Sequence, residues 1–316
     1  MADREYRGMK IRLITNKGDW NTAQTGKGKF VSRLIPALKK IGVDTVNDMS
    51  PVDIDIQLGK HVYEPVSCKK SIVRMGPAHV DKSKDYKALN KRKSRAVGKA
   101  DGVIYQSEFS KKMCDKFLGK ATGLTDIIYN GANPEDYMVK KVSVPDSVNF
   151  LASTRTWTKQ KRLKDIVKSF ELANITGSCL YVAGAVKKEY KADNVNYLGP
   201  LDDRQIARWL RTCNTLISIV YLDACPNSVV EALNAGCNVV CTDMGGTHEL
   251  APSLVVKDTP WDFKPIDLNK PPKVNREALA EALRHSTVKR EFPTELVHID
   301  NVALRYKAFF ERVLGE

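Results

Sequence analysis

Residues 223–236 read DACPNSVVEALNAG, and this stretch decides the fold. It follows an apolar run of strand length at residues 216–220, and Pro226 with Asn227 marks the start of a helix. Gly236 is a typical helix stop. A strand that runs directly into a helix, repeated along a chain, is the pattern of a parallel sheet covered by helices.

The same alternation extends over the whole chain. The first half predicts a helix at residues 27–41 and strands at residues 11–15, 53–58, 71–75, 102–106 and 126–129. The second half predicts helices at residues 163–172 and 227–235, and strands at residues 148–153, 179–183, 196–198, 216–220 and 238–241. Two successive doubly wound α/β units of Rossmann type follow from this pattern.

The 316 residues exceed what one hydrophobic core usually supports, which also favours two domains. The sequence KKVSVP at residues 140–145 interrupts the periodicity. We therefore expect a first domain at residues 1–145 and a second at residues 146–299. A final helix at residues 301–314 is apolar around much of its circumference, so residues 300–316 are expected to pack back on the first domain. Residues 257–274 are expected to form an irregular loop.

The helix that begins near Asn227 is a candidate anion site. A helix N-terminus at the carboxyl end of a parallel strand presents free N–H groups and a positive dipole end, which suits a diphosphate. Glu231 lies one turn into this helix and could reach a ribose, while Asp223 lies on the loop ahead of the phosphate. A solvent-facing glutamate and a turn aspartate remain the alternative interpretation of the same spacing.

The stretch resembles the signature of the retaining glycosyltransferase family 4, whose usual form is Glu-x-Phe-Pro-Asn-x-x-x-Glu-Ala-x-Ala-x-Gly. Matching residues are Pro226, Asn227, Ser228, Glu231, Ala232, Ala235 and Gly236. Position 223 departs from the signature, because it carries Asp where the family usually has Glu. The resemblance implies the GT-B fold, in which two Rossmann-like domains face a central cleft, and a nucleotide-sugar donor held by the second domain.

Further landmarks of the family occur in the expected order. Arg155 and Lys161 resemble the two cations that neutralise the donor diphosphate, although Arg162 replaces the glycine that commonly follows the lysine and Lys159 competes for its role. Tyr197 and Leu198 resemble the loop that packs on the nucleobase. The sequence TDMGGTHEL at residues 242–250 is similar to another loop of the family.

In the first domain, the resemblance implies a site role for His79, close to the donor sugar. A loop histidine bonded to backbone is the alternative interpretation. We take His79 and Asp223 as the catalytic candidates. Gly26 and Gly28 would let the first loop approach the donor or the acceptor closely.

Family members need no metal ion, and we expect none here. Asp53 and Asp55 have the letters of a metal-binding Asp-x-Asp motif, but the alternation of apolar residues around them predicts a strand. Charge on the leaving diphosphate would then be met by cations and a helix dipole.

Positive charge is concentrated in the first half of the chain. The net charge is +14, and residues 60–120 hold 16 basic and 6 acidic side chains. Such a concentration indicates a polyanionic partner. The densest run supplies the candidate contact residues, which are Lys91, Arg92, Lys93 and Arg95. A solvated helix face is the alternative.

Two acceptor classes fit an enzyme with this charge. The first is duplex DNA that carries hydroxymethylated pyrimidines, by analogy with bacteriophage DNA-modifying glycosyltransferases. The second is a lipid-linked or cell-envelope glycan at an anionic membrane. Small apolar residues in the predicted helix at residues 85–100 favour DNA over insertion into lipid. A non-catalytic nucleotide-sugar or nucleic-acid-binding protein is a third possibility.

The expected co-substrate is a nucleotide-sugar, with UDP as the first choice of nucleotide, and no cofactor is expected. Seven scattered cysteines without a Cys-x-x-Cys pair suit reduced thiols. The polar first residues and the absence of a long apolar run predict a cytoplasmic protein, which would be the host cytoplasm for a viral protein.

Overall fold

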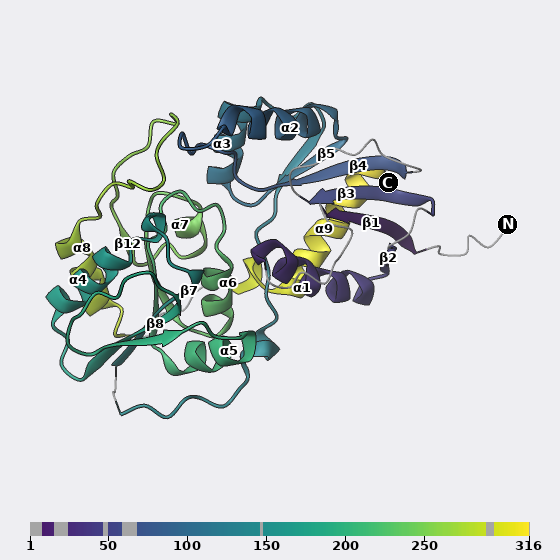
Figure 1. Cartoon of the computed structure of the whole chain (residues 1–316). Helices are drawn as coiled ribbons and strands as arrows, with labels where there is room; N and C mark the ends of the chain where they lie inside the picture. The colour runs from purple at the N-terminus through teal and green to yellow at the C-terminus, as the bar shows by residue number, and fades with distance from the viewer. Residues whose placement is uncertain are drawn as a thin grey trace. The chain divides into compact units, whose positions relative to one another are not determined.

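The computed structural model describes residues 8–15, 25–46, 50–58, 68–145, 148–288 and 294–315. Internal contacts divide the chain into two compact units (Figure 1). Unit 1 comprises Met1–His79, Asp85–Gly131 and Ile299–Glu316, and unit 2 comprises Val80–Lys84 and Ala132–His298. Residues 132–145 therefore belong to unit 2 by their contacts, whereas we expected the first domain to extend to residue 145.

The described residues of unit 1 form a six-stranded parallel sheet in the order β2-β1-β3-β4-β5-β6. Its strands are β1 (Met9–Thr15), β2 (Val43–Val46), β3 (Val52–Leu58), β4 (Cys68–Met75), β5 (Gly102–Tyr105) and β6 (Leu124–Ile127). Its helices are α1 (Gly26–Lys40), α2 (Tyr86–Lys99), α3 (Glu108–Leu118) and α9 (Ile299–Leu314).

Helix α9 completes the core of unit 1, although it lies at the other end of the sequence. Its Tyr306, Phe309 and Phe310 are fully buried in the cluster that also contains Phe30 of α1. Each such side chain contributes roughly 1.5–3 kcal/mol through burial. At Gly102 of β5, an added Cβ would lie 2.9 Å from the Phe309 ring, so a glycine is required where α9 approaches the sheet.

The Asp-x-Asp letters of residues 53–55 lie within strand β3, as the apolar alternation predicted. Asp55 is fully buried and accepts a hydrogen bond from Arg12 Nε at 2.8 Å. Asp53 accepts from the Lys10 N–H at 2.9 Å and pairs with Lys69. Both carboxylates therefore bind residues of the neighbouring strands β1 and β4.

The described residues of unit 2 form a second six-stranded parallel sheet, in the order β12-β11-β10-β7-β8-β9. Numbered along the unit, this order is 6-5-4-1-2-3, the order of dinucleotide-binding Rossmann folds. The strands are β7 (Val148–Thr156), β8 (Ser178–Ala185), β9 (Val195–Gly199), β10 (Thr215–Ser218), β11 (Asn238–Thr242) and β12 (Val255–Val256). The helices are α4 (Leu163–Ala173), α5 (Asp203–Thr212), α6 (Asn227–Asn234), α7 (Thr247–Leu250) and α8 (Arg276–His285). Short 3-10 turns occur at η1 (Pro134–Tyr137), η2 (Lys159–Lys161) and η3 (Thr294–Leu296).

The two parallel-sheet units confirm the predicted fold class. Residues 257–274 contain no regular helix or strand, as expected. In the part of the chain that the structure describes, no helix is both long enough and apolar enough to cross a membrane.

Candidate functional site

The candidate site lies at the carboxyl edge of the sheet in unit 2, where the strand order reverses. Strands β7 and β10 pair only at Phe150 with Thr215 and at Leu151 with Leu216, after which β7 continues to Thr156. In open α/β sheets, ligands bind outside the carboxyl ends of the strands at this reversal. The two loops that leave these strands carry Lys161 and Asp223.

Lys161 ends the short turn η2 between β7 and α4 and is half-buried. Its ammonium donates to the Thr154 hydroxyl and, at 2.6 Å, to the Thr156 carbonyl. Burial lowers the pKa of Lys161, and the electrostatic effect of Asp223 opposes this shift. The side chain is thus a partly desolvated cation, and an arriving anion would compensate the lost hydration.

Asp223 lies on the loop between β10 and α6. Its Oδ1 accepts the Cys225 N–H at 3.1 Å, and its carbonyl accepts the Gly246 N–H at 2.8 Å. Burial raises the pKa of the Asp223 carboxyl, against the lowering effects of the Cys225 N–H and Lys161. The carboxylate of Asp223 and the ammonium of Lys161 therefore lie close enough to interact, and both are shielded from water.

Gly245 is the residue that lets the loop after β11 approach Asp223. Its φ is +134°, and an added Cβ would lie 2.7 Å from the Asp223 carbonyl oxygen. Both facts require glycine. The residues of the expected loop at 242–250 are thus in direct backbone contact with the signature stretch.

Helix α6 begins immediately after the loop that carries Asp223, with Pro226 as its N-cap. No side chain caps its first turn, which contains Asn227 and Ser228. Glu231 lies one turn further and is 4% exposed, so it is not the solvent-facing glutamate of the alternative interpretation. The helix N-terminus supplies N–H donors and a positive dipole end at the reversal point of the sheet.

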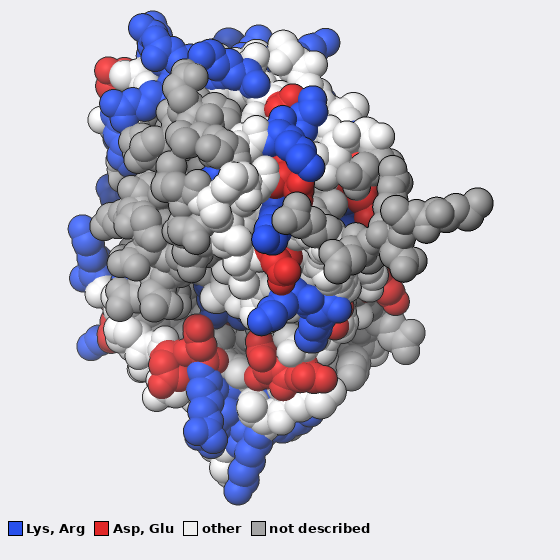
Figure 2. All heavy atoms as spheres, turned by 90° about the vertical axis from the view of Figure 1, so that its right-hand side faces the viewer, with Lys and Arg blue, Asp and Glu red and all other residues white. Residues whose placement is uncertain are grey.

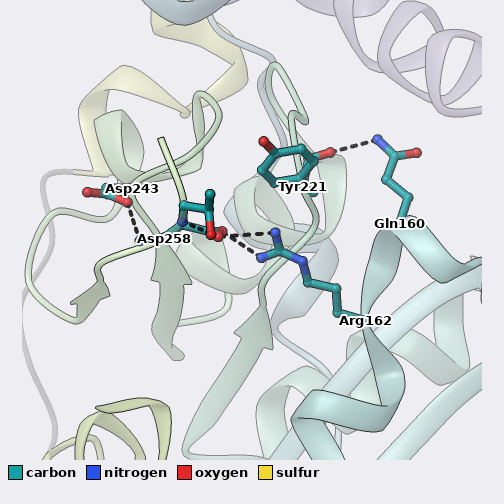
Figure 3. A network of polar contacts seen from close by, with 6 residues as sticks. Gln160, Arg162, Tyr221, Asp243 and Asp258 are labelled. Carbon is teal, nitrogen blue, oxygen red and sulfur yellow. Dashed lines mark hydrogen bonds and ion pairs between the residues drawn. The ribbon is translucent and has the colours of Figure 1, made fainter. Parts of the chain in front are cut away.

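A polar network joins the loops around the site (Figure 3). The Tyr221 N–H donates to the Gln160 carbonyl at 3.1 Å, and Gln160 Nε2 donates to the Tyr221 carbonyl at 2.7 Å. Arg162 pairs with Asp258, whose N–H donates to Asp243 Oδ1 at 2.8 Å. Sequence reasoning missed this network, because its members are far apart in the chain. The one available signal was the arginine in place of glycine at position 162.

The other predicted residues of unit 2 lie on neighbouring segments. Arg155 is exposed near the end of β7. Tyr197 and Leu198 lie on β9 and are half-buried. The Tyr197 hydroxyl accepts the Tyr190 N–H at 2.8 Å and donates to the Tyr190 carbonyl at 3.1 Å. The Tyr197 ring packs against the hydrophobic core of unit 2, and its role at a nucleobase stays a prediction.

The candidates of unit 1 lie on other elements. His79 follows β4, and its N–H and carbonyl are both bonded to the Asn90 side chain, at 2.8 and 2.7 Å. Gly26 and Gly28 lie in the first turn of α1, where the Thr25 hydroxyl accepts the Gly28 N–H at 3.1 Å. The Gly28 N–H is therefore used in capping the helix.

Helix α2 carries the basic run, and three of its four candidate contact residues, Lys91, Arg92 and Arg95, are exposed. Lys93 requires a correction. It is only 6% exposed, and its ammonium donates to the Pro77 carbonyl at 2.5 Å, so it is an internal residue of unit 1. Figure 2 shows Lys and Arg side chains along the upper edge of the molecule, at the height of α2 and α3 in Figure 1. The exposed basic residues on or directly beside these two helices include Lys87, Lys91, Arg92, Arg95, Lys99, Lys112, Lys116 and Lys120.

Replacing Asp223 by asparagine is expected to stabilise the protein at neutral pH. Because burial raises the pKa of Asp223, the folded state binds its proton more tightly than the unfolded state does. Ionised Asp223 thus costs stability at pH 7, and this cost disappears as the pH falls below the usual range of a carboxyl. Thermal unfolding from pH 4 to 8 should show a gain for Asp223→Asn that shrinks toward acid. A variant that is less stable than the wild type at every pH would contradict this assignment.

Comparison with known proteins agrees with the fold. Residues 147–265 match the family described as glycosyl transferases group 1. Among solved structures, a sucrose-phosphate synthase from Thermosynechococcus elongatus is similar with a TM-score of 0.64 and 14% identity, over 97% of this chain and 99% of that one. AviGT4, a glycosyltransferase involved in avilamycin A biosynthesis, is similar with a TM-score of 0.61 and 16% identity, over 97% and 98%.

A structure of HepE from Anabaena in complex with UDP and glucose is similar with a TM-score of 0.61 and 12% identity, over 95% of this chain and 98% of that one. No curated protein matches the sequence. The two parallel-sheet units are those of the GT-B class of glycosyltransferases. The group 1 match covers residues 147–265 within unit 2, and together with this fold it indicates a glycosyltransferase.

Proposed function

We propose that the chain transfers a sugar from a nucleotide-sugar, UDP-linked in the first instance, to a hydroxyl group. The transfer would retain the anomeric configuration and would need no metal ion. The observation that carries the proposal is the meeting of Lys161, Asp223 and the α6 N-terminus at the strand-order reversal of unit 2. Solved structures that resemble this chain include HepE with UDP-glucose and a pneumococcal O-GlcNAc transferase with UDP and GlcNAc.

Stabilisation of the leaving diphosphate falls to groups of the protein. Lys161 is a desolvated cation, Arg155 lies near the end of the preceding strand, and α6 directs its N-terminus at the same edge. Preorganised charges of this kind act strongly in a site with little water. Within the described residues, no three His, Cys, Asp or Glu side chains are grouped so as to hold a metal ion. Retention itself is carried over from the resemblance to family 4.

The two carboxylates would hold the two sugars of the donor. Asp223 precedes the anion site and would accept hydrogen bonds from hydroxyls of the transferred sugar. Glu231 is buried one helical turn beyond the site and would accept from the ribose. An aspartate is one methylene shorter than the glutamate of the family signature. We therefore expect Asp223 to make the donor sugar of this chain differ from that of the common family pattern.

The direct test is a transfer assay with a panel of nucleotide-sugars in EDTA. Duplex DNA containing hydroxymethylated cytosine or uracil serves as acceptor, and mass spectrometry of the digested nucleosides detects a sugar adduct. NMR of the purified adduct then gives the anomeric configuration. An adduct of retained configuration is expected. Transfer that appears only after Mg²⁺ or Mn²⁺ is added, or an inverted product, would overturn the corresponding part of the proposal.

We propose DNA as the acceptor because of the surface formed by α2 and α3. This surface carries the exposed cations of both helices, and its acidic side chains are fewer. The exposed positions of α2 carry charged and small side chains in place of the bulky apolar ones that insert into lipid. Phosphate contacts by such cations position a nucleic acid without reading its sequence.

Neutralising three cations of α2 should weaken DNA binding. For the triple variant Lys91→Ala, Arg92→Ala and Arg95→Ala, we expect the salt dependence of binding to flatten by about 1 in log–log slope for each lost phosphate contact. Fluorescence anisotropy between roughly 50 and 200 mM salt measures this slope.

The matched control replaces three exposed arginines of α5, which are Arg204, Arg208 and Arg211. An unchanged slope in the α2 variant, or an equal loss in the α5 variant, would contradict the surface assignment. Loss of binding to anionic vesicles with DNA binding intact would assign the surface to a membrane.

A further inference from the structure

Arg162 adopts a backbone conformation that suits glycine. Its φ and ψ are 56° and 36°, in the left-handed region that residues with a Cβ rarely enter. It is the residue directly before α4, at the position where the resemblance gives glycine. The local backbone alone would therefore favour glycine, so the arginine side chain must supply a compensating interaction.

That interaction is a buried ion pair. Arg162 Nη1 lies 2.5 Å from Asp258 Oδ2, and Arg162 Nη2 lies 3.1 Å from Asp258 Oδ1, so the contact is bidentate. The exposed fractions of the two side chains are 1% and 0%. The guanidinium carbon also lies 4.7 Å from the centroid of the Tyr221 ring. Unlike exposed ion pairs, a buried bidentate pair fixes the relative position of the segments that carry it.

Three segments of the site meet at this side chain (Figure 3). Arg162 comes from the loop between β7 and α4, directly after Lys161. Tyr221 belongs to the loop between β10 and α6, two residues before Asp223, and is bonded reciprocally to Gln160. Asp258 follows β12, and its N–H donates to Asp243, the residue directly after β11. Lys161 is thus adjacent to Arg162, and Asp223 lies two residues after Tyr221, so both are close in sequence to residues of the Arg162 network.

We propose that Arg162 is a positioning residue for donor binding. Its side chain fixes the loop of Asp223 and the segment of Asp258 against the loop of Lys161, so that the site is formed before the nucleotide arrives. This inference rests on the proposed function, because the nucleotide is the ligand for which the geometry is set. Preorganisation of this kind lowers the ordering cost of binding.

The test uses the double variant Arg162→Gly, Asp258→Asn in the full chain. Both buried charges are removed together and glycine suits the left-handed backbone, so we expect the double variant to fold and to unfold at a higher temperature than either single variant. Each single variant leaves one buried charge unpaired and should unfold at a lower temperature. In the free double variant, amide hydrogen exchange should rise in residues 219–226 and 256–260. Its affinity for UDP, measured by calorimetry, should fall about tenfold.

The matched control is Arg276→Ala, Asp165→Asn, which removes an arginine–aspartate pair between α8 and α4 with contacts of 2.7 and 2.8 Å. Its hydrogen exchange in the two loops and its UDP affinity should equal those of the wild type. Arg162→Lys keeps a cation beside Asp258 and should lie between the wild type and the double variant.

Unchanged loop exchange in the double variant would overturn the proposal, and so would raised exchange with unchanged UDP affinity. Absence of UDP binding by the wild type would instead count against the proposed function. Hydrogen exchange in the free protein would then still decide whether Arg162 positions the loops.

Discussion

Replacing Lys161 by alanine is expected to lower the rate of sugar transfer by about 10²–10³-fold, the usual cost of removing one preorganised group that stabilises developing charge. Negative charge grows on the diphosphate as the sugar leaves. Lys161 is partly desolvated, so its attraction for this charge is screened less than that of an exposed lysine. The effect should fall mainly on kcat, because the charge is greatest in the transition state.

Lys159→Ala is the control for this prediction. Lys159 belongs to the same short turn, is exposed, and was the competing candidate from the sequence. Its loss should change the rate by less than about tenfold, since exposed charges are well screened. A large loss in Lys159→Ala with activity retained in Lys161→Ala would transfer the role to Lys159.

Replacing Glu231 by glutamine is expected to weaken donor binding by about 10–150-fold. Hydrogen bonds to a charged group contribute roughly 1.5–3 kcal/mol, and each 1.4 kcal/mol is a factor of ten. Glu231 would contact the ribose, which is remote from the reacting atoms, so the ground state and the transition state lose equal stabilisation. The KM for the donor should therefore rise while kcat changes little.

Glu277→Gln on the exposed side of α8 serves as the control, with wild-type kinetics expected. Thermal unfolding of Glu231→Gln should show a folded protein, because the replacement keeps the size of the buried side chain. A fall in kcat at unchanged KM would place Glu231 in the chemical step and would contradict its assignment to the ribose.

Elements with a clear apolar period were predicted well from the sequence. The predicted helix at residues 163–172 corresponds to α4, Leu163–Ala173, and the predicted strand at residues 238–241 corresponds to β11, Asn238–Thr242. Strand β2 was missed because its sequence, VDTV, has only two apolar residues and no longer apolar run around it. Helix α5 was missed although Ile206, Trp209 and Leu210 have the i, i+3, i+4 spacing of one helix face.

At the site, the sequence identified residues but could not give their environments. Proximity of Lys161 to Asp223 depends on strand order, which brings β7 next to β10 although more than fifty residues separate them. Lys93 is buried because its ammonium donates to the Pro77 carbonyl, and the pattern of charges in the sequence gives no sign of this contact. The role of Arg162 depends on a positive φ and on Asp258, neither of which is visible in the local sequence.

We expect unit 2 to bind a nucleoside diphosphate through its own cations and the N-terminus of α6. Calorimetric titration of UDP into the protein in EDTA tests it most directly. We expect saturable binding at one site per chain without any divalent metal ion, and weaker binding in the Lys161→Ala variant, because free UDP carries the charge of the leaving diphosphate. Binding of no nucleoside diphosphate, or binding only when a divalent metal ion is added, would contradict the account.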